Sequence, residues 1–449
     1  MKKILSLVLS SVLALGILAG CGSKTNATVE TPGNAETPVA STEEVTIRVQ
    51  WWGGDDRHEA TLNAIKEFEA THPLIKVKAE YGGWDGHKDK VTTMIAGNTA
   101  PDVMQINYDW ISTFSADGKG FYDLRSLSDH IKLDNWSDDV LKFGEINGVL
   151  NAIAVSVTGR SVFYNKTTYD ALGVAIPKTW DELIAAGKAF EAKDPTKYPF
   201  DLDTGSGFTG LYMALAYEAQ KTGKEFITAD GKLGFTEAEI LDAFNFYLSL
   251  EKNHVIRTQK ERMNDSGEDA LYQTEKFING SVAGVLEWSS SIGKFEKVLT
   301  ENPTPQELVL GELLVMDGAK NSGWMQKPSL LFAINGKTEH PVESAIFLDW
   351  LLNDAASSKL LGSSRGIPSS KAALAALEGT KALEGISFNA TKQIADSKPL
   401  LISPYLENSS LKEVYKVAIE DISYGSKTPE AAAKYFVEQV TKILTEIVK

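Results

Sequence analysis

The chain alternates between strand-like and helix-like segments, and this alternation most constrains its fold. Residues 45–49 (VTIRV) place apolar side chains at every second position, which is typical of a strand. Leu62, Ile65 and Phe68 then recur at helical spacing, and residues 75–79 alternate again. The folded part is therefore expected to begin as strand, turn, helix and strand, with the turn at residues 51–54. This order predicts the α/β class, in which helices cover a sheet.

Later segments extend this pattern. Residues 102–106 and 152–155 are predicted to be short buried strands. Thr179 and Glu182 have the spacing of a capping box at a helix start, so Trp180 is interpreted as a packing residue. Helices are also predicted around residues 241–250, 346–352 and 436–447, the last one opened by residues 428–430. With 449 residues, the chain exceeds the ~250–300 at which one core stops growing, so about two domains are expected.

The only cysteine, Cys21, follows Leu-Ala-Gly at the end of an apolar run. Residues 1–20 resemble a lipoprotein signal peptide, since two lysines precede a run too short to span a bilayer. We therefore expect residues 21–44 to be a lipidated cysteine and a disordered tether, which places the protein at the extracellular face of the bacterial cytoplasmic membrane. A simple secretory signal and a membrane-spanning anchor are the alternatives.

Composition and motif spacing argue against several functions. The net charge of -15 disfavours a nucleic-acid partner. The six histidines are scattered, so neither a metal site nor a cofactor is expected. There is no Gly-x-Ser-x-Gly elbow for nucleophilic hydrolysis. Residues 205–210 match Gly-x-Gly-x-x-Gly, but they lie too deep in the chain to open a dinucleotide domain, and we predict a loop that lets Phe208 face a cleft.

Several of the nine tryptophans adjoin glycine and charged residues. Trp51 and Trp52 precede Gly-Gly-Asp-Asp-Arg, Trp84 lies among glycines, and Trp288 follows Glu287. A pyranose ring stacks its C–H face on aromatic planes, while carboxylates, amides and guanidinium groups bind its hydroxyls. These segments therefore predict a sugar-binding cleft, whereas Trp136 and Trp350 are expected to pack in the core.

Five segments, taken in order, resemble the large maltose-binding-like family of extracellular solute-binding proteins that serve ABC importers. They are residues 97–103, 163–166, 177–183, 277–284 and 366–368. The resemblance runs from Val45 to the C-terminus. It implies a two-lobed periplasmic-binding-protein-like fold of type II, with mixed sheets flanked by helices and a hinged inter-lobe cleft. Residues 45–156 plus 322–370 would form the first lobe, and residues 157–321 plus 371–449 the second.

The resemblance also implies a set of ligand-binding residues. These are Trp51, Trp52, Asp55, Arg57, Trp84, Asp85, Asn107, Tyr108, Asp109, Arg160, Phe208, Glu287, Trp288, Trp324 and Arg365. Residues 51–58, 327–329 and 365–368 are most similar to members associated with plant cell-wall oligosaccharides, including pectic ones. The arginines would pair with uronate carboxylates or bind hydroxyls, so both acidic and neutral sugars remain open.

The function that follows is capture of an oligosaccharide and its delivery to ABC permease subunits. The protein is expected to be monomeric, to reach the membrane through its lipid and to perform no catalysis. A secreted glycan-active enzyme, with Asp55 and Asp56 or Glu287 as acid and base, is one alternative. A surface glycan-binding adhesin is the other.

Overall fold

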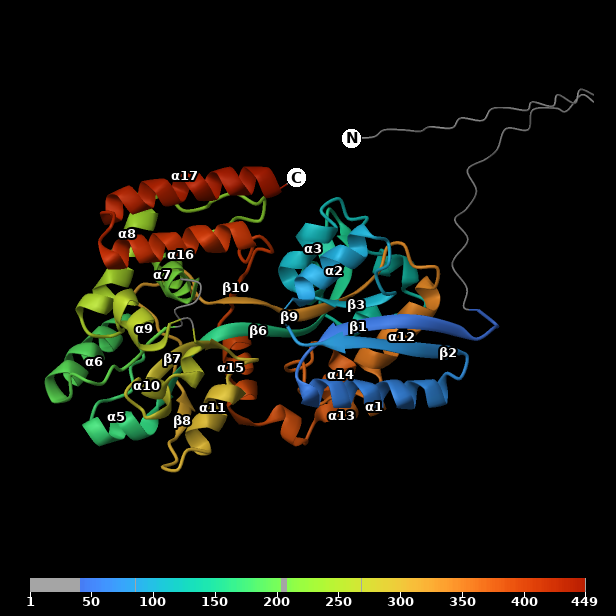
Figure 1. The fold of residues 1–449 in the computed structure, drawn as a ribbon, viewed down its shortest axis with the longest axis horizontal. Coiled ribbons are helices and arrows are strands. Elements are labelled where there is room, and N and C mark those ends of the chain that lie inside the picture. Colours follow the sequence, from blue (N-terminus) through green and yellow to red (C-terminus); the bar gives the residue numbers. More distant parts are fainter. Residues whose placement is uncertain (1–40, 85, 203–207, 268, 449) are drawn as a thin grey trace, which may run out of the picture. The chain divides into compact units, whose positions relative to one another are not determined.

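The computed structural model describes residues 41–84, 86–202, 208–267 and 269–448. Every element described below belongs to the compact unit of residues 38–449, which is called the second unit (Figure 1). The predicted signal peptide, Cys21 and most of the tether lie outside the described residues. So do Asp85 and most of the glycine-rich loop before Phe208.

A mixed sheet forms the centre of the second unit, with strand order β2-β1-β3-β9-β6-β7. β1 pairs in parallel with β2 and β3, whereas β9 is antiparallel to β3 and β6, and β6 is antiparallel to β7. β10 adds to β9, and β8 adds to β6. The strands are β1 Val45–Trp52, β2 Ile75–Gly82, β3 Val103–Ile106, β4 Glu145–Ile146, β5 Val149–Leu150, β6 Ala152–Asn165, β7 Gly284–Trp288, β8 Leu308–Leu310, β9 Met325–Ile334 and β10 Leu400–Leu401.

Helices flank this sheet, which confirms the predicted α/β class (Figure 1). They are α1 Asp55–Thr71, α2 His87–Ala96, α3 Tyr108–Phe114, α4 Asp138–Lys142, α5 Lys166–Leu172, α6 Trp180–Lys193, α7 Phe208–Thr222, α8 Glu237–Lys252, α9 Gln259–Ser266, α10 Glu275–Ile278, α11 Gly293–Thr300, α12 Pro341–Asn353, α13 Ala355–Leu361, α14 Lys371–Leu377, α15 Gly385–Asp396, α16 Ser409–Tyr424 and α17 Pro429–Ile447. Within the described residues, none of these helices combines the length and the apolar character that crossing a membrane requires.

The beginning of the fold is strand, helix, strand as predicted, with two corrections. Trp51 and Trp52 belong to β1, so the predicted turn at residues 51–54 shrinks to two glycines. α1 buries Ile65 and Phe68, but Leu62 is 37% exposed. Helical spacing alone therefore placed one apolar side chain on the wrong face of the helix.

β6 is much longer than the predicted strand at residues 152–155. Its first half pairs with β9, and its second half, from Arg160 onward, pairs with β7 and β8. The predicted lobe boundary at 156/157 thus falls inside one continuous strand. Gly159 lies where the pairing changes, and a Cβ there would be 2.6 Å from a methyl group of Ile394 and 2.8 Å from the carbonyl oxygen of Met325. Only glycine permits this close approach.

Three tryptophans predicted to be structural are buried as expected: Trp136, Trp180 and Trp350. The indole nitrogen of Trp180 donates to Gln220 Oε1 at 2.9 Å, next to a Thr179 side chain that caps α6. α17 likewise begins after a capping Thr428 and buries one apolar face. The threonine caps and the helical periodicity are thus confirmed, but the predicted capping box is only half formed, because the Glu182 carboxylate accepts from the backbone N–H of Lys178 and not of Thr179.

Candidate functional site

Trp288, the last residue of β7, is surrounded by cations. Its cross-strand partner on β6 is Arg160, whose guanidinium carbon lies 4.7 Å from the indole centroid. Lys327 on β9 places its Nζ 4.6 Å from the same centroid. Tyr212 meets the indole edge-on at 6.0 Å. An indole face attracts positive charge, so the ring of Trp288 interacts favourably with Arg160 and Lys327. Part of the same indole remains exposed.

Lys327 is buried and forms an ion pair with Glu407, which lies just before α16. Burial alone would raise the pKa of Glu407, but Lys327, Lys412 and Arg160 hold the pKa of this carboxyl below its ordinary value. Burial lowers the pKa of Lys327, and Glu407 partly offsets that effect. The pair is therefore an ionised buried contact directly next to Trp288.

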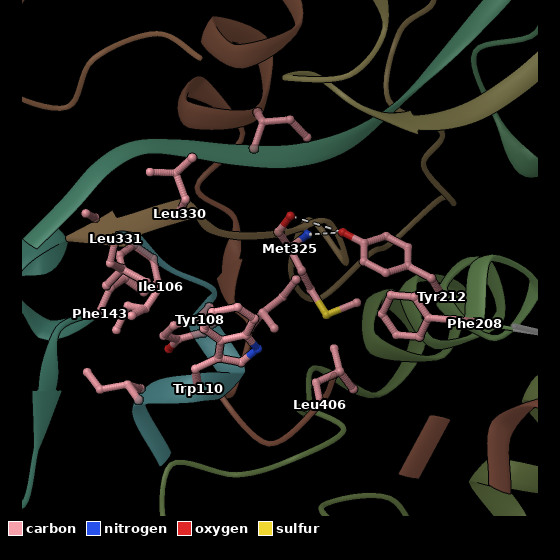
Figure 2. Close-up of a cluster of buried hydrophobic side chains, with 14 of the residues drawn as sticks. Ile106, Tyr108, Trp110, Phe143, Phe208, Tyr212, Met325, Leu330, Leu331 and Leu406 are labelled. Carbon is pink, nitrogen blue, oxygen red and sulfur yellow. Dashed lines mark hydrogen bonds between the residues drawn. The ribbon is translucent and has the colours of Figure 1, made fainter. Parts of the chain in front are cut away.

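Phe208 and Tyr212, both on α7, extend the aromatic surface. The guanidinium of Arg160 lies 5.6 Å from each ring centroid, and Lys412 Nζ lies 5.8 Å from that of Phe208. The Tyr212 hydroxyl donates to the carbonyl oxygen of Met325 at 3.0 Å, which fixes the ring against β9. Figure 2 shows this part of the core, with Tyr108 and Trp110 from α3 on the other side of Met325.

Arg57 and Arg365 form a second cationic group at the carboxyl ends of β1 and β3. Arg57 donates to the carbonyl oxygens of Trp52 and Ser364, each at 3.0 Å, and burial lowers its pKa to about 10. Arg365 is 4% exposed, and its Nε donates to Gln105. Both Nη atoms of Arg365 are buried without a hydrogen-bond partner in the described structure, and burial, followed by the charge of Arg57, lowers the pKa of Arg365.

An aromatic cluster joins β1, α2 and α3. Trp84 is 51% exposed and stacks on Trp110 with an interplanar angle of 13°. Trp52 packs against both rings and against His87. Burial, together with the charge of Lys90, lowers the pKa of His87 to about 4, so the ring is neutral near pH 7. Trp84 thus offers an accessible indole on a rigid support.

The segment after β3 carries Asn107, Tyr108 and Asp109. Asn107 donates to Asp109, and Lys88 forms an ion pair with Asp109 at 3.1 Å. Tyr108 is buried and lines a cavity of about 380 Å³ that also reaches Tyr405. Burial, and next the charge of Glu407, raises the pKa of Tyr108 above its ordinary value.

Other predicted site residues lie in covered or peripheral positions. Trp51 is buried and stacks on Tyr81, while Trp324 is buried and donates its indole N–H to the carbonyl oxygen of Leu314. Glu287 is buried and accepts from the backbone N–H of Trp288 at 2.6 Å. Asp55 is exposed in the first turn of α1.

Sequence reasoning missed four residues of this site: Tyr212, Lys327, Glu407 and Lys412. Tyr212 was hidden in a helical pattern, and Glu407 and Lys412 lie in a stretch without a motif. Lys327 belonged to a segment that carried the family resemblance, but its side chain was not assigned a role. Only the approach of α7 and α16 to β9 makes these residues neighbours of Trp288.

A larger cavity, about 520 Å³, lies at the opposite ends of β1 and β3, where Thr46, Arg48 and Asp102 line it. Its central carboxylate is already bound by the protein: Asp102 accepts from the backbone of Arg48 and from Thr338. Across residues 41–448, apart from the gaps, no three side chains form a group that would hold a metal ion.

The fold and this site define a class of protein. The model of the family described as bacterial extracellular solute-binding protein matches residues 54–357. The chain belongs to the bacterial extracellular solute-binding protein family.

Two solved structures are similar over most of the chain. A periplasmic solute binding protein from Pectobacterium atrosepticum has 35% identity and a TM-score of 0.84, covering 90% of this chain and 100% of that one. A periplasmic oligogalacturonide binding protein from Yersinia enterocolitica, in complex with saturated digalacturonic acid, has 37% identity and a TM-score of 0.81 at 90% and 100% coverage. These similarities confirm the predicted periplasmic-binding-protein-like fold.

Curated relatives match over shorter stretches. The diacetylchitobiose binding protein of Streptomyces coelicolor is 33% identical over 141 residues, which cover 31% of this chain and 32% of that protein. The matched part of this chain thus spans about a third of that relative's length.

Proposed function

We propose that this protein is the substrate-binding lipoprotein of an ABC importer and that its ligand is an oligosaccharide bearing uronate groups. The observation that carries the proposal is the placement of Arg160 and Lys327 over the ring of Trp288. The C–H face of a sugar would contact the exposed part of the indole, while its carboxylate would pair with the adjacent cations.

Two features favour an acidic over a neutral sugar. Arg365 has two buried Nη atoms without partners, and the hydrogen bonds of Arg57 go to uncharged carbonyl oxygens. In the described structure, the guanidinium groups of Arg57 and Arg365 therefore have no anionic partner near the carboxyl ends of β1 and β3. This local positive charge contrasts with the net charge of -15 of the whole chain. The digalacturonic acid bound by the Yersinia enterocolitica relative supports the same choice.

Capture would proceed by closure of two lobes around the ligand. Trp84, Asn107, Asp109 and Arg57 would contribute from the first lobe, and Arg160, Phe208 and Trp288 from the second. A ligand drives closure only by binding the closed form more tightly than the open one. The closed complex, held near the membrane through a lipid on Cys21, would then deliver its cargo to the permease as a monomer.

A thermal-shift screen tests this function. The chain without residues 1–20 and with Cys21→Ser, which prevents lipidation, is heated with oligosaccharides of five kinds: pectin-derived, xylo-, manno-, malto- and galacto-oligosaccharides. A ligand that binds only the folded state raises the melting temperature, so pectin-derived acids should give the largest shift. A larger shift with any neutral series would contradict the uronate assignment.

The two alternative functions have their own readouts. Release of shorter products during prolonged incubation would establish a glycan-active enzyme instead. Scattering curves that stay identical with and without a bound oligosaccharide would favour an adhesin, because they would exclude lobe closure.

A further inference from the structure

The carboxylate of Glu407 lies among the cationic side chains near Trp288. It forms an ion pair with Lys327, and both side chains are buried. Lys412 and Arg160 are the next cations whose charge acts on it. Arg160 and Lys327 lie over the indole where a sugar would stack, and Lys412 lies over the neighbouring ring of Phe208.

Glu407 accepts fewer hydrogen bonds than Asp201, a structural carboxylate in the same protein. Buried Asp201 accepts hydrogen bonds from Arg257, Arg262 and the backbone of Leu202. Within the described residues, the carboxylate of Glu407 accepts a hydrogen bond from a single donor, Lys327. A group with one donor loses one interaction when it withdraws, whereas Asp201 would lose three.

The position of Glu407 in the chain also permits withdrawal. It lies in the short connection between β10 and α16, directly before Asn408, which caps α16. Tyr405 of the same connection lines the 380 Å³ cavity together with Tyr108. Withdrawal of Glu407 would therefore be a movement within this connection, which is neither part of β9 nor of α16.

We propose that Glu407 is a built-in competitor of the ligand's carboxylate for Lys327. A uronate would take the place of Glu407 at Lys327, and Glu407 would move away from that ammonium group. This inference rests on the proposed function, since it requires an acidic ligand at Trp288.

This competition would let the site discriminate between acidic and neutral sugars. An acidic sugar replaces the ion pair that it breaks, and Lys327 keeps a negative partner. A neutral sugar in the same position would leave Lys327 buried beside hydroxyl groups only, which is less favourable than the original pair. Glu407 thus excludes neutral sugars from the place where acidic ones bind.

The test compares Glu407→Gln with the unaltered protein by calorimetric titration of digalacturonate and of galactobiose, its uncharged counterpart. Because Lys327 loses its internal partner, the Kd for digalacturonate should fall roughly threefold to tenfold. Selectivity over galactobiose should decrease, because a neutral sugar no longer has an ion pair to break. Without ligand, the variant should melt at a lower temperature, because a buried ammonium group is left unpaired. Higher affinity would thus accompany lower stability.

A matched control is Glu312→Gln, which removes a carboxylate from an exposed ion pair with Lys178. Its affinity for digalacturonate should equal that of the unaltered protein. Glu407→Asp retains the charge but shortens the reach to Lys327, so it should shift the Kd in the same direction by less. This second variant keeps the test informative if Glu407→Gln does not fold.

Two results would overturn the inference, and they are distinguishable. If the unaltered protein binds digalacturonate and both Glu407 variants bind it equally or more weakly, Glu407 is a fixed support of Lys327 and not a competitor. If the unaltered protein binds no acidic oligosaccharide at all, the proposed function fails and this inference fails with it.

Discussion

Arg160 and Trp288 face each other across the β6–β7 ladder, with the guanidinium carbon 4.7 Å from the indole centroid. This pair joins a cation to an aromatic surface at the point where β6 leaves β9 and begins to pair with β7. Strand pairing fixes its geometry, so the site is built on rigid elements. Lys327 then adds a second cation from β9.

Replacing Trp288 by alanine should remove most of the melting-temperature increase that digalacturonate causes. The variant loses the surface for the sugar ring and the group that orients Arg160 and Lys327. Trp350→Phe is the matched control, since Trp350 is buried in α12, where it packs against Phe68 of α1. It should lower the melting temperature without ligand and leave the ligand-induced increase intact. An unchanged increase in Trp288→Ala would remove this residue from the site.

Replacing Arg365 by methionine should weaken digalacturonate binding about tenfold while changing stability little. The substitution removes two unpartnered buried Nη atoms together with one hydrogen bond to Gln105, so the two effects on the free energy of unfolding oppose each other. Calorimetric titration and urea unfolding measure both quantities. Arg48→Met, at a surface pair with Glu80, is the control and should leave binding unchanged. Unaltered affinity in Arg365→Met would show that its charge does not act on the ligand.

Local patterns in the sequence predicted the fold well. Alternating apolar residues located β1 and β2, and threonine caps located the starts of α6 and α17. The length of β6 was not predictable from its composition, because residues 158–161 (Thr-Gly-Arg-Ser) interrupt the apolar pattern after Val157. Its continuation depends on pairing first with β9 and then with β7, which are distant in the sequence. Tertiary pairing thus overrode local propensity.

Gly159→Ala should destabilise the protein by about 1–3 kcal/mol, because overpacking forces neighbouring atoms to move. The added Cβ would meet Ile394 at 2.6 Å and the Met325 carbonyl oxygen at 2.8 Å. Urea unfolding measures the change. Gly148→Ala is unsuitable as a control because its φ is +79°, whereas Gly293→Ala, in the first turn of α11 with open space around it, should not destabilise the protein. Equal stability of the Gly159 and Gly293 variants would contradict the close approach at β6.

Glu218 should make stability depend on pH. This side chain on α7 is 1% exposed, its Oε2 has no hydrogen-bond partner in the described structure, and burial raises its pKa to about 7. Because the raised pKa favours the protonated form in the folded state, the stabilisation is fully present below about pH 4.5 and is lost as the pH rises through about 7.

Glu218→Gln should therefore be more stable than the unaltered protein at about pH 8, by on the order of 1–2 kcal/mol, and nearly equal at about pH 5. Urea unfolding at both pH values provides the measurement. Exposed Glu438→Gln should show the same small difference at both. A pH-independent effect of Glu218→Gln would indicate that the carboxyl does not titrate in this range.

The candidate site was only partly predictable. Tryptophans next to glycine and charged residues correctly drew attention to Trp84 and Trp288, which retain exposed surface. The same signal also selected Trp51, and the family resemblance selected Trp324. Both are covered by protein, because sequence does not reveal which face of a strand or loop is buried. Glu407 lay outside every motif. Its position depends on how the connection after β10 meets β9, a contact between residues 80 positions apart.

Calorimetric titration of the exported chain, carrying Cys21→Ser, with digalacturonate and with galactobiose at low and high salt tests the central claim most directly. Binding through Arg160, Lys327 and Arg365 predicts tighter binding of digalacturonate, with an affinity that falls as salt is added. Galactobiose should bind more weakly, and its affinity should not depend on salt. Equal affinities for the two sugars, or digalacturonate binding that is unaffected by salt, would contradict the assignment of an acidic ligand to this site.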